Sequence, residues 1–264
     1  MLSFNNLGNL GRLGNQMFQY ASLKGISSYH GYEFCIPPRE VFGQKDQNVN
    51  KDLNLYDVFD IDNRNNIRLT QNQIITEKTH TFDKELFNSC KDDIDLLGYF
   101  QTEKYFKHIE DEIRIHFSFN LELYENCKAF IDSLNSKVVS IHIRRGDYLG
   151  NPNHPIQTLD YYKQALRLLP QELPVLIFSD DRNWCSSQEL FDDNRFIISK
   201  NSSLDADLCM MSLCDYHIIA NSSFGWWGSW LAKSQKTIAP KKWFGGSCLN
   251  KDIIDMKFGN WIWA

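Results

Sequence analysis

Strands and helices alternate along the second half of this chain. Short apolar runs rich in β-branched residues indicate buried strands. They lie at Val138–Ile143, Val175–Phe178, Arg195–Ile198, Tyr216–Ala220 and Thr237–Ala239. Apolar positions at helical spacing predict helices between them, at Leu159–Leu169, Leu204–Leu213 and Phe224–Ala232. A strand followed by a helix, repeated in this way, predicts an α/β domain with a parallel sheet.

The first half of the chain has fewer clear strands. Its helices are predicted at Gln16–Tyr29, Lys104–His116 and Leu121–Leu134, and its short strands at Tyr32–Ile36 and Leu96–Phe100. The polar stretch 43–54 is expected to be a surface loop. We therefore expect a second, less regular α/β domain, with one domain at residues 1–135 and the other at residues 136–264.

Composition narrows the classes of protein to consider. The 264 residues carry a net charge of −5, which gives no support for nucleic-acid binding. No apolar run approaches the roughly 18 residues of a transmembrane helix, and the first residues lack a signal-peptide pattern. Seven dispersed cysteines without a CxxC pair are typical of reduced thiols in a cytoplasmic protein. The histidines show no HExxH sequence and no zinc-site spacing.

The most informative segment follows the predicted strand Val138–Ile143. It places Arg144, Arg145 and Asp147 at the carboxyl end of a buried strand, with His142 just inside that end. Ligands of open α/β sheets bind at this end, and arginine grips phosphate oxygens with paired hydrogen bonds. The segment therefore predicts a site for a phosphate-bearing ligand. The alternative is a surface cluster of salt bridges.

Two further segments have the residues of an anion site. Gly8–Gln16 places a glycine at every third position ahead of a helix, so its backbone can approach a ligand while the first helical amides face an anion. Ala220–Trp227 joins a strand to a helix, and its hydroxyls and the free backbone amides of the helix start can bind an anion. The alternatives are a loop that caps a helix and ordinary N-capping. Tryptophans at helical spacing follow and are expected in the core: Trp226, Trp227 and Trp230.

Asp205-Ala206-Asp207 forms a D-x-D sequence, which in some enzymes holds a divalent metal on a nucleotide diphosphate. Here it opens a predicted helix, where the helix dipole favours carboxylates. Such pairs also arise by chance in a chain with 33 acidic residues. The sequence therefore favours a helix start over a metal site.

Six blocks, taken in order, resemble one enzyme family. They are GRLGNQMFQYA (11–21), GYFQTEKYF (98–106), HIRRGDY (142–148), FSDD (178–181), residues 207–231 with ANSSFGWWGSWL, and APKKWF (239–244). This order resembles the bacterial α-1,2-fucosyltransferases of glycosyltransferase family eleven. The resemblance implies a GT-B-type α/β fold, with two Rossmann-like domains facing a cleft. It also implies inverting transfer of L-fucose from GDP-fucose to a galactoside hydroxyl of an oligosaccharide acceptor, without a metal.

The resemblance also implies site residues, position by position. Arg144 matches an arginine on the donor's β-phosphate, and His142 matches a residue at the guanine. Asp207 precedes Ser223 by sixteen positions, the interval that in core-modifying relatives separates a guanine-binding aspartate from a phosphate-binding serine. Asn15 and Gln16 match an element beside the sugar. The expected donor-binding residues are Gly14, Gln16, His142, Arg145, Asp207, Ser222, Ser223 and Phe224.

The catalytic base does not carry over. Where core-modifying relatives have a lysine and a proposed glutamate base, this chain has Tyr148 and Pro152. Beside Arg144, the candidate catalytic residues are Asp147 and His154 as bases, or Asn15 as a residue that orients the acceptor hydroxyl. Two other functions stay open, namely use of another GDP-sugar and a non-catalytic module that binds a nucleotide or a glycan.

Overall fold

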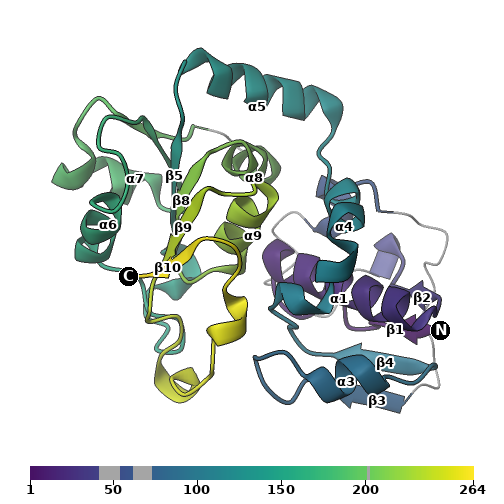
Figure 1. Cartoon of the computed structure of the whole chain (residues 1–264). Helices are drawn as coiled ribbons and strands as arrows, with labels where there is room; N and C mark the ends of the chain where they lie inside the picture. The colour runs from purple at the N-terminus through teal and green to yellow at the C-terminus, as the bar shows by residue number, and fades with distance from the viewer. Residues whose placement is uncertain (42–53, 62–72, 201–202) are drawn as a thin grey trace. The chain divides into compact units, whose positions relative to one another are not determined.

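The computed structural model describes residues 1–41, 54–61, 73–200 and 203–264, so the loop predicted at 43–54 lies outside the described residues except for its last position. The chain forms two compact units, and Figure 1 shows its course through them. The first unit comprises residues 1–120 and 252–257, and the second comprises 121–251 and 258–264. This division lies ahead of the predicted boundary between residues 135 and 136, because helix α5 (Leu121–Ser133) packs against helix α8 (Leu204–Ser212) of the second unit.

The second unit is built on a six-stranded sheet with the strand order β10-β9-β8-β5-β6-β7. Every pair of neighbours in it is parallel. The strands are β5 (Val139–Ile143), β6 (Val175–Ser179), β7 (Phe196–Ile198), β8 (Tyr216–Ile218), β9 (Lys236–Ala239) and β10 (Trp261–Trp263). From β5 the chain adds β6 and β7 on one side, then returns to add β8, β9 and β10 on the other. The strand order therefore reverses between β5 and β8.

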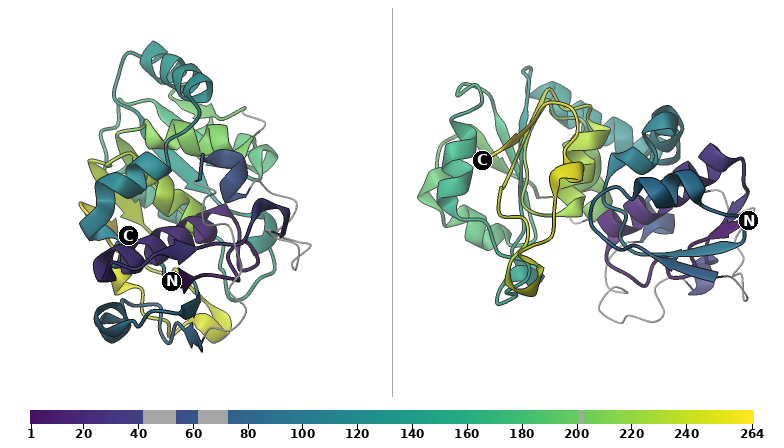
Figure 2. Two further views of the ribbon diagram at one scale, coloured as in Figure 1. Left: turned by 90° about the vertical axis from the view of Figure 1, so that its right-hand side faces the viewer. Right: turned by 60° about the horizontal axis from the view of Figure 1, so that its bottom comes forward.

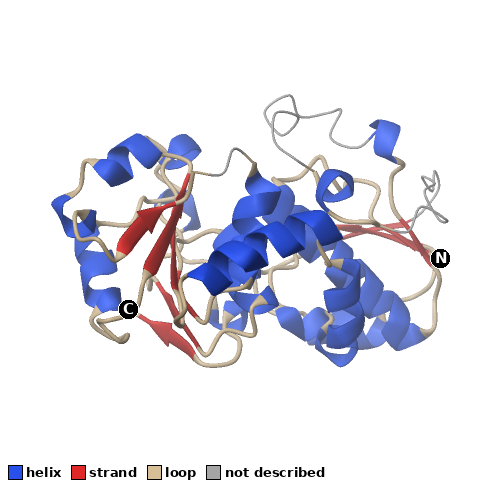
Figure 3. Ribbon diagram, turned by 90° about the horizontal axis from the view of Figure 1, so that it is seen from above, coloured by secondary structure: helices blue, strands red, loops and turns tan. Residues whose placement is uncertain are grey.

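Helices cover both faces of this sheet, as Figure 3 shows in colours for helix and strand. Helices α6 (Leu159–Leu166) and α7 (Arg182–Ser186) lie on one side, and α8 and α9 (Ser223–Leu231) lie on the other (Figures 1 and 2). All residues of β5 and β6 are buried, as expected of central parallel strands. The core position predicted for the α9 tryptophans is confirmed, since each is at most 1 % exposed: Trp226, Trp227 and Trp230.

The first unit has a smaller parallel sheet with the strand order β2-β1-β4-β3. Its strands are β1 (Leu2–Ser3), β2 (Phe34–Cys35), β3 (Gln73–Thr76) and β4 (Ile94–Leu97). Its helices are α1 (Leu13–His30), α2 (Leu55–Val58), α3 (Lys84–Ser89) and α4 (Glu110–His116). Neither β1 nor β3 is expected from the sequence, because runs this short give no alternating pattern.

The helix predicted at Lys104–His116 is wrong in its first half. Two 3-10 turns, η2 (Glu103–Tyr105) and η3 (Lys107–Ile109), precede α4. Phe106 between them has φ −133° and ψ 6°, outside the helical range, and its ring centroid lies 6.5 Å from that of Phe18 on α1. Packing of this buried ring against α1 therefore overrides the local helix propensity.

A late segment of the chain completes the first unit. Asp255 accepts a hydrogen bond from the Phe82 amide at 2.8 Å and forms an ion pair with Lys104. Met256 beside it is fully buried. The chain then continues to β10, which pairs with β9 at the edge of the larger sheet. The first unit thus consists of two separate stretches of sequence.

In the part of the chain that the structure describes, no helix has the length and apolar character needed to cross a membrane. Each of the seven cysteines is a free thiol, and all but Cys248 are buried.

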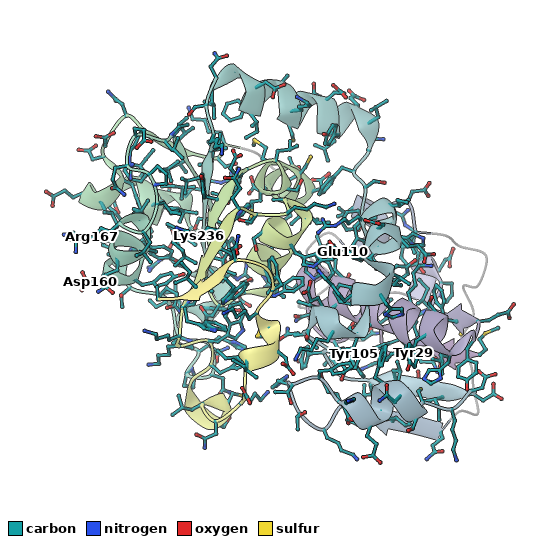
Figure 4. All side chains as sticks on the ribbon, viewed as in Figure 1. Tyr29, Tyr105, Glu110, Asp160, Arg167 and Lys236 are labelled. Atoms are coloured by element: carbon teal, nitrogen blue, oxygen red, sulfur yellow. The ribbon has the colours of Figure 1, made fainter. Side chains whose placement is uncertain are left out.

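Helix α1 approaches η2 closely at Gly25. A Cβ atom on Gly25 would lie 2.1 Å from the carbonyl oxygen of Tyr105, a contact that requires the backbone to shift. Tyr105 is itself held by Phe87 of α3, whose ring centroid lies 6.3 Å from that of Tyr105 and 4.5 Å from that of Tyr29. Figure 4 labels Tyr105 and Tyr29. The absence of a side chain at Gly25 therefore sets the distance between α1 and η2.

We expect Gly25→Ala to destabilise the protein by about 1–3 kcal/mol, the usual effect of overpacking a closed site. At a helix position with open space around it, Gly→Ala raises the free energy of unfolding by about 1 kcal/mol. A decrease for Gly25→Ala would therefore indicate the close contact between α1 and η2. Ser28→Ala, at an exposed position of α1, is the matched control and should not destabilise. The measurement is urea unfolding. A Gly25→Ala protein as stable as the control would contradict the packing described here.

Candidate active site

The carboxyl ends of β5 and β8 meet at the point where the strand order reverses. The two strands are neighbours in the sheet, and beyond their ladder the Ala220 amide donates a hydrogen bond to the His142 carbonyl at 3.1 Å. In open α/β sheets this position is the usual place for a ligand. The structure therefore brings together two of the predicted segments, the one around Arg144 and the one around Ser222.

Arg144 lies at this position, held by two carboxylates. Its Nη2 is 2.6 Å from Asp147 Oδ1 and its Nη1 is 3.0 Å from Asp180 Oδ2, and its side chain is only 16 % exposed. Its guanidinium carbon also lies 5.5 Å from the ring centroid of Tyr148. The salt bridges considered as an alternative are thus present, but in a half-enclosed position at the sheet edge. The same guanidinium edges suit phosphate oxygens.

Arg145 has a different environment from its neighbour. Its Nε is 3.0 Å from Asp181 Oδ2, and its guanidinium lies 4.0 Å from the ring centroid of Trp184. The hydrogen bond from Arg145 holds the pKa of Asp181 below its ordinary value. Asp181 in turn caps α7 by accepting the amide of Trp184. Arg145 therefore fastens the start of α7 to the end of β5, a structural role that its sequence position does not reveal.

The amino end of α9 forms the other side of the site. Ser222 is its N-cap, and its hydroxyl oxygen accepts the Phe224 amide at 3.3 Å. The capping considered as an alternative is therefore present. Ser223 is the first helical residue and is partly exposed, so the positive end of the helix dipole faces outward here. The segment can stabilise negative charge at this edge of the sheet.

His142 is buried beneath the first turn of α9. Its ring lies 5.6 Å from that of Phe224, and a Cβ on Gly225 would fall 2.7 Å from its Nδ1. Among the described residues, this buried nitrogen has no hydrogen-bond partner. Burial lowers the pKa of His142 to about 3, with a further contribution from the charge of Arg144. The imidazole is therefore neutral at any working pH.

Asn221 joins three loops at this edge of the sheet and is missed by the sequence reasoning. Its Nδ2 donates to the Trp243 carbonyl at 2.8 Å, and its Oδ1 accepts from Gln157 at 2.9 Å. Its carbonyl accepts the Tyr148 hydroxyl at 3.1 Å. Asn221 is 1 % exposed. The only sequence signal is an asparagine at a strand end, and its partners are too distant in sequence to be inferred.

His154, like Arg144, contacts the ring of Tyr148. Its ring is stacked on Tyr148, with centroids 5.0 Å apart and an interplanar angle of 25°, and it contacts Phe244 at 5.8 Å. Burial lowers its pKa below the ordinary 6.5, Lys251 acts in the same direction, and Asp147 opposes the shift. The structure therefore places both candidate bases next to Tyr148, with His154 mostly neutral near pH 7.

The two carboxylates of the D-x-D sequence do not converge. Asp207 is 4 % exposed; its Oδ1 accepts from the Ser199 hydroxyl at 2.6 Å, and its Oδ2 lies 3.6 Å from Arg182 Nη2. Asp205 lies two positions earlier on α8, and residues two apart in a helix do not face each other. Within the described ranges, no three His, Cys, Asp or Glu side chains are grouped as metal ligands.

In the first unit, the glycine turn leads directly into α1. Gln16 is buried, donates to the Gly11 carbonyl at 3.3 Å and accepts the Leu55 amide at 3.0 Å, so its bonds are structural. Gly14 is buried beside it. Asn15 is partly exposed, and its Oδ1 accepts from Gln101 at 2.7 Å. Gln101 is a second residue that the sequence reasoning misses, although it belongs to the GYFQ block.

Comparisons with known proteins agree with these features. The sequence model of the family described as Glycosyl transferase family 11 matches residues 3–264. An alpha-1,2-colitosyltransferase of Escherichia coli is 32 % identical, over 91 % of this chain and 92 % of its own length. The O-antigen biosynthesis glycosyltransferase WbnK of Escherichia coli is also 32 % identical, over 67 % of this chain and 64 % of its own. The galactoside 2-alpha-L-fucosyltransferase SEC1 of Bos taurus is 24 % identical, over 84 % of this chain and 62 % of its own.

Solved structures share the fold. The NodZ alpha-1,6-fucosyltransferase soaked with GDP-fucose has a TM-score of 0.55 at 12 % identity, covering 91 % of this chain and 94 % of its own. NodZ from Bradyrhizobium has a TM-score of 0.54 at 12 % identity, covering 86 % of this chain and 91 % of its own. These likenesses, with the two parallel sheets, confirm the predicted fold class of α/β, GT-B type.

The two fully buried histidines of the second unit predict a pH dependence of stability. Burial lowers the pKa of His142 to about 3 and that of His217 to about 4. Both stay neutral in the folded protein, whereas the unfolded chain binds their protons below about pH 6.5. The contribution of these two histidines to stability should therefore be constant well above pH 6.5 and fall below it, by up to about 1.4 kcal/mol per pH unit for each histidine.

Urea unfolding at several pH values between 7.5 and 5.5 measures this slope, in a range where most carboxylates remain ionised. His217→Gln, which removes one of the two titrating groups, should reduce the slope whatever its effect on stability at neutral pH. A slope near zero in the wild type, or one unaffected by the substitution, would contradict the assignment.

Proposed function

Because this chain belongs to glycosyl transferase family 11, we propose that it transfers L-fucose from GDP-fucose to a galactoside hydroxyl of a glycan, in α-1,2 linkage and with inversion. The observation that carries the proposal is the position of Arg144 at the end of β5, where the strand order reverses and the neighbouring strand β8 leads into α9. Tyr148, whose ring lies 5.5 Å from the Arg144 guanidinium, donates to the Asn221 carbonyl just before that helix. The GT-B fold shared with an alpha-1,6-fucosyltransferase soaked with GDP-fucose supports it.

Charge at the leaving group explains why these elements suit the reaction. As the bond between the sugar and GDP breaks, negative charge grows on the β-phosphate. Arg144, the hydroxyls of Ser222 and Ser223 and the amide of Ser223 are donors that can face this charge, whereas the Ser222 amide already donates to the Ala220 carbonyl. Arg144 then exchanges part of its bonding to Asp147 and Asp180 for phosphate oxygens. Asp147, the more exposed of the two carboxylates, is the one expected to give way.

Guanine recognition is proposed for Asp207 and His142. Asp207 is already bonded to Ser199 and lies near Arg182, which fixes the orientation of its carboxylate. Each carboxylate oxygen has two lone pairs, so acceptor capacity remains for the N1 and N2 donors of guanine. The neutral imidazole of His142 adds no charge to the site. Uracil and adenine lack this pair of donors, so GDP is the expected nucleotide.

We propose that transfer needs no metal ion. Arg144 and the positive end of the α9 dipole would neutralise the charge of the diphosphate, as a bound cation does in other enzymes. Asp207 of the D-x-D sequence contacts Ser199 and lies 3.6 Å from Arg182, and Asp205, two positions earlier on the same helix, does not face it. They are therefore unsuited to chelating one ion.

Two groups remain candidates for the base that removes the acceptor proton. His154 is suited because its lowered pKa leaves it unprotonated at neutral pH. Asp147 is suited once phosphate replaces it on Arg144, because its carboxylate is then released.

One relative supports a second donor sugar. The Escherichia coli relative that matches 91 % of this chain is named for transfer of colitose. Colitose is L-fucose without its 3-hydroxyl group. The GDP part of GDP-colitose would therefore make the same phosphate and guanine contacts as that of GDP-fucose. We propose fucose as the donor sugar, with colitose as the alternative.

Arg144→Ala should lower turnover by about three orders of magnitude, the scale of losing an oriented donor at developing charge. Arg144→Lys should recover little, because an ammonium group cannot reproduce the two parallel hydrogen bonds of a guanidinium. Arg167→Ala is the matched control, since Arg167 lies exposed at the end of α6 (Figure 4). Initial rates and thermal unfolding are measured together. Near-normal turnover of a stably folded Arg144→Ala protein would contradict the phosphate role and favour a purely structural salt bridge.

The donor is tested by calorimetric titration of GDP, UDP and ADP, followed by transfer assays in EDTA with GDP-fucose and GDP-colitose. GDP should bind at least about tenfold more tightly than UDP or ADP, a difference of about 1.4 kcal/mol. Transfer to galactose-terminated oligosaccharides should persist in EDTA and give an α-1,2 product by NMR. Activity lost in EDTA and restored by manganese would contradict metal independence. GDP binding without transfer would favour the non-catalytic alternative.

A further inference from the structure

The chain turns back sharply after β5, in the 3-10 turn η4 (Gly146–Tyr148). The Tyr148 amide donates to the Arg145 carbonyl at 2.8 Å, which closes the turn. Asp180, just after the neighbouring strand β6, fixes the turn by accepting the Arg145 amide at 2.9 Å. The turn returns the Tyr148 side chain to Arg144, whose guanidinium carbon lies over its ring, 5.5 Å from the centroid.

This ring contact differs in kind from the ion pairs of Arg144. Asp147 and Asp180 occupy N–H groups of the guanidinium, and a phosphate needs the same groups. An aromatic ring attracts the cation through its face and presents no carboxylate oxygen that competes with phosphate. The contact with Tyr148 can therefore persist when phosphate displaces Asp147, and it can keep the guanidinium in place during the exchange.

The hydroxyl of Tyr148 is anchored at the approach to α9. It donates to the Asn221 carbonyl at 3.1 Å, and Asn221 directly precedes Ser222, the N-cap of the helix. Asn221 is itself a fixed point, because it is 1 % exposed and two hydrogen bonds hold its side chain. Tyr148 thus reaches from the Arg144 guanidinium to the start of α9, and the rigid ring sets the distance between them.

The loop of His154 supports the ring of Tyr148. The two rings are stacked, with centroids 5.0 Å apart and an interplanar angle of 25°. The residue before His154 fastens this loop to the next one, since the Asn153 carbonyl accepts the Gly245 amide at 3.0 Å and its Oδ1 accepts the Ser247 amide at 2.9 Å. The orientation of the Tyr148 ring is therefore determined by its surroundings.

We propose that Tyr148 is a positioning residue for the leaving group, which holds the Arg144 guanidinium at a fixed distance from the start of α9 so that both meet the β-phosphate together. All of these groups belong to the second unit. Tyr148 acts through Arg144 and has no contact of its own with the phosphate. The inference rests on the proposed function, because it takes the β-phosphate as the ligand of Arg144.

Tyr148→Phe tests the role of the anchor, because it keeps the ring and removes the hydroxyl that holds it. Turnover should fall about tenfold, the scale of one lost hydrogen bond. GDP affinity should fall by a similar factor, since GDP carries the charge that the leaving group acquires. The KM for GDP-fucose should change little, because its β-phosphate has one negative charge fewer than that of GDP. Tyr148→Leu, which also removes the ring over Arg144, should lower turnover and GDP affinity further.

Tyr216→Phe is the matched control. Tyr216 begins β8, at the opposite end of the sheet from the site, and Lys137 Nζ lies over its ring at 5.9 Å. The same hydroxyl is lost from a ring that also carries a cation, but no phosphate donor depends on it. Turnover and GDP affinity should therefore stay at the wild-type level.

A double-substitution cycle with Arg144→Ala separates positioning from a general disturbance of the fold. Once Arg144 is gone, Tyr148→Phe should cost no further turnover, whereas an unrelated structural effect would add to the loss. Thermal unfolding identifies the folded variants, and if Tyr148→Leu does not fold, Tyr148→Phe and the cycle decide. Wild-type turnover and GDP affinity in Tyr148→Phe, or full additivity with Arg144→Ala, would overturn the inference. Wild-type protein without GDP affinity or transfer would instead overturn the proposed function.

Discussion

The pairing of β5 with β8 is the constraint on which the second unit depends. These strands are distant in sequence, yet their parallel ladder brings both carboxyl ends to one edge of the sheet. The end of β5 supplies Arg144 and the end of β8 leads into α9, so a cationic side chain and a helix dipole come together. Asn221 then ties the surrounding loops to one another through the Tyr148 hydroxyl and the Trp243 carbonyl. The candidate site therefore depends first on the strand order, which brings these segments together, and only then on the individual residues.

Arg144 and Arg145 show how neighbouring residues of one type acquire different roles. At the end of a strand, consecutive side chains point to opposite sides. Arg144 therefore reaches Asp147 and Tyr148, while Arg145 reaches Asp181 and Trp184. Asp180 links the two, since it pairs with the Arg144 side chain and accepts the Arg145 amide at 2.9 Å. The position of one guanidinium is thereby coupled to the packing of the other.

Much of the fold could be predicted from the sequence, because β5, β6 and α9 carry strong local patterns. The short strands β1 and β3 could not, since they are recognisable only from their partners in the sheet. The same limit applies to the site. Arg144 is indicated by its place after a buried strand, whereas Asn221 and Gln101 matter through contacts with residues far along the chain. Phe106 shows a third case, in which tertiary packing defeats a helical pattern.

The return of residues 252–257 to the first unit limits how this architecture can be exchanged among relatives. A recombinant made by joining the first 120 residues of one protein to the remainder of another would pair Phe82 and Lys104 with a foreign equivalent of Asp255. Grafting the first unit intact requires a junction before α5 and a further junction on each side of the short late segment. The two units of such enzymes would therefore be inherited less independently than their separate sheets suggest.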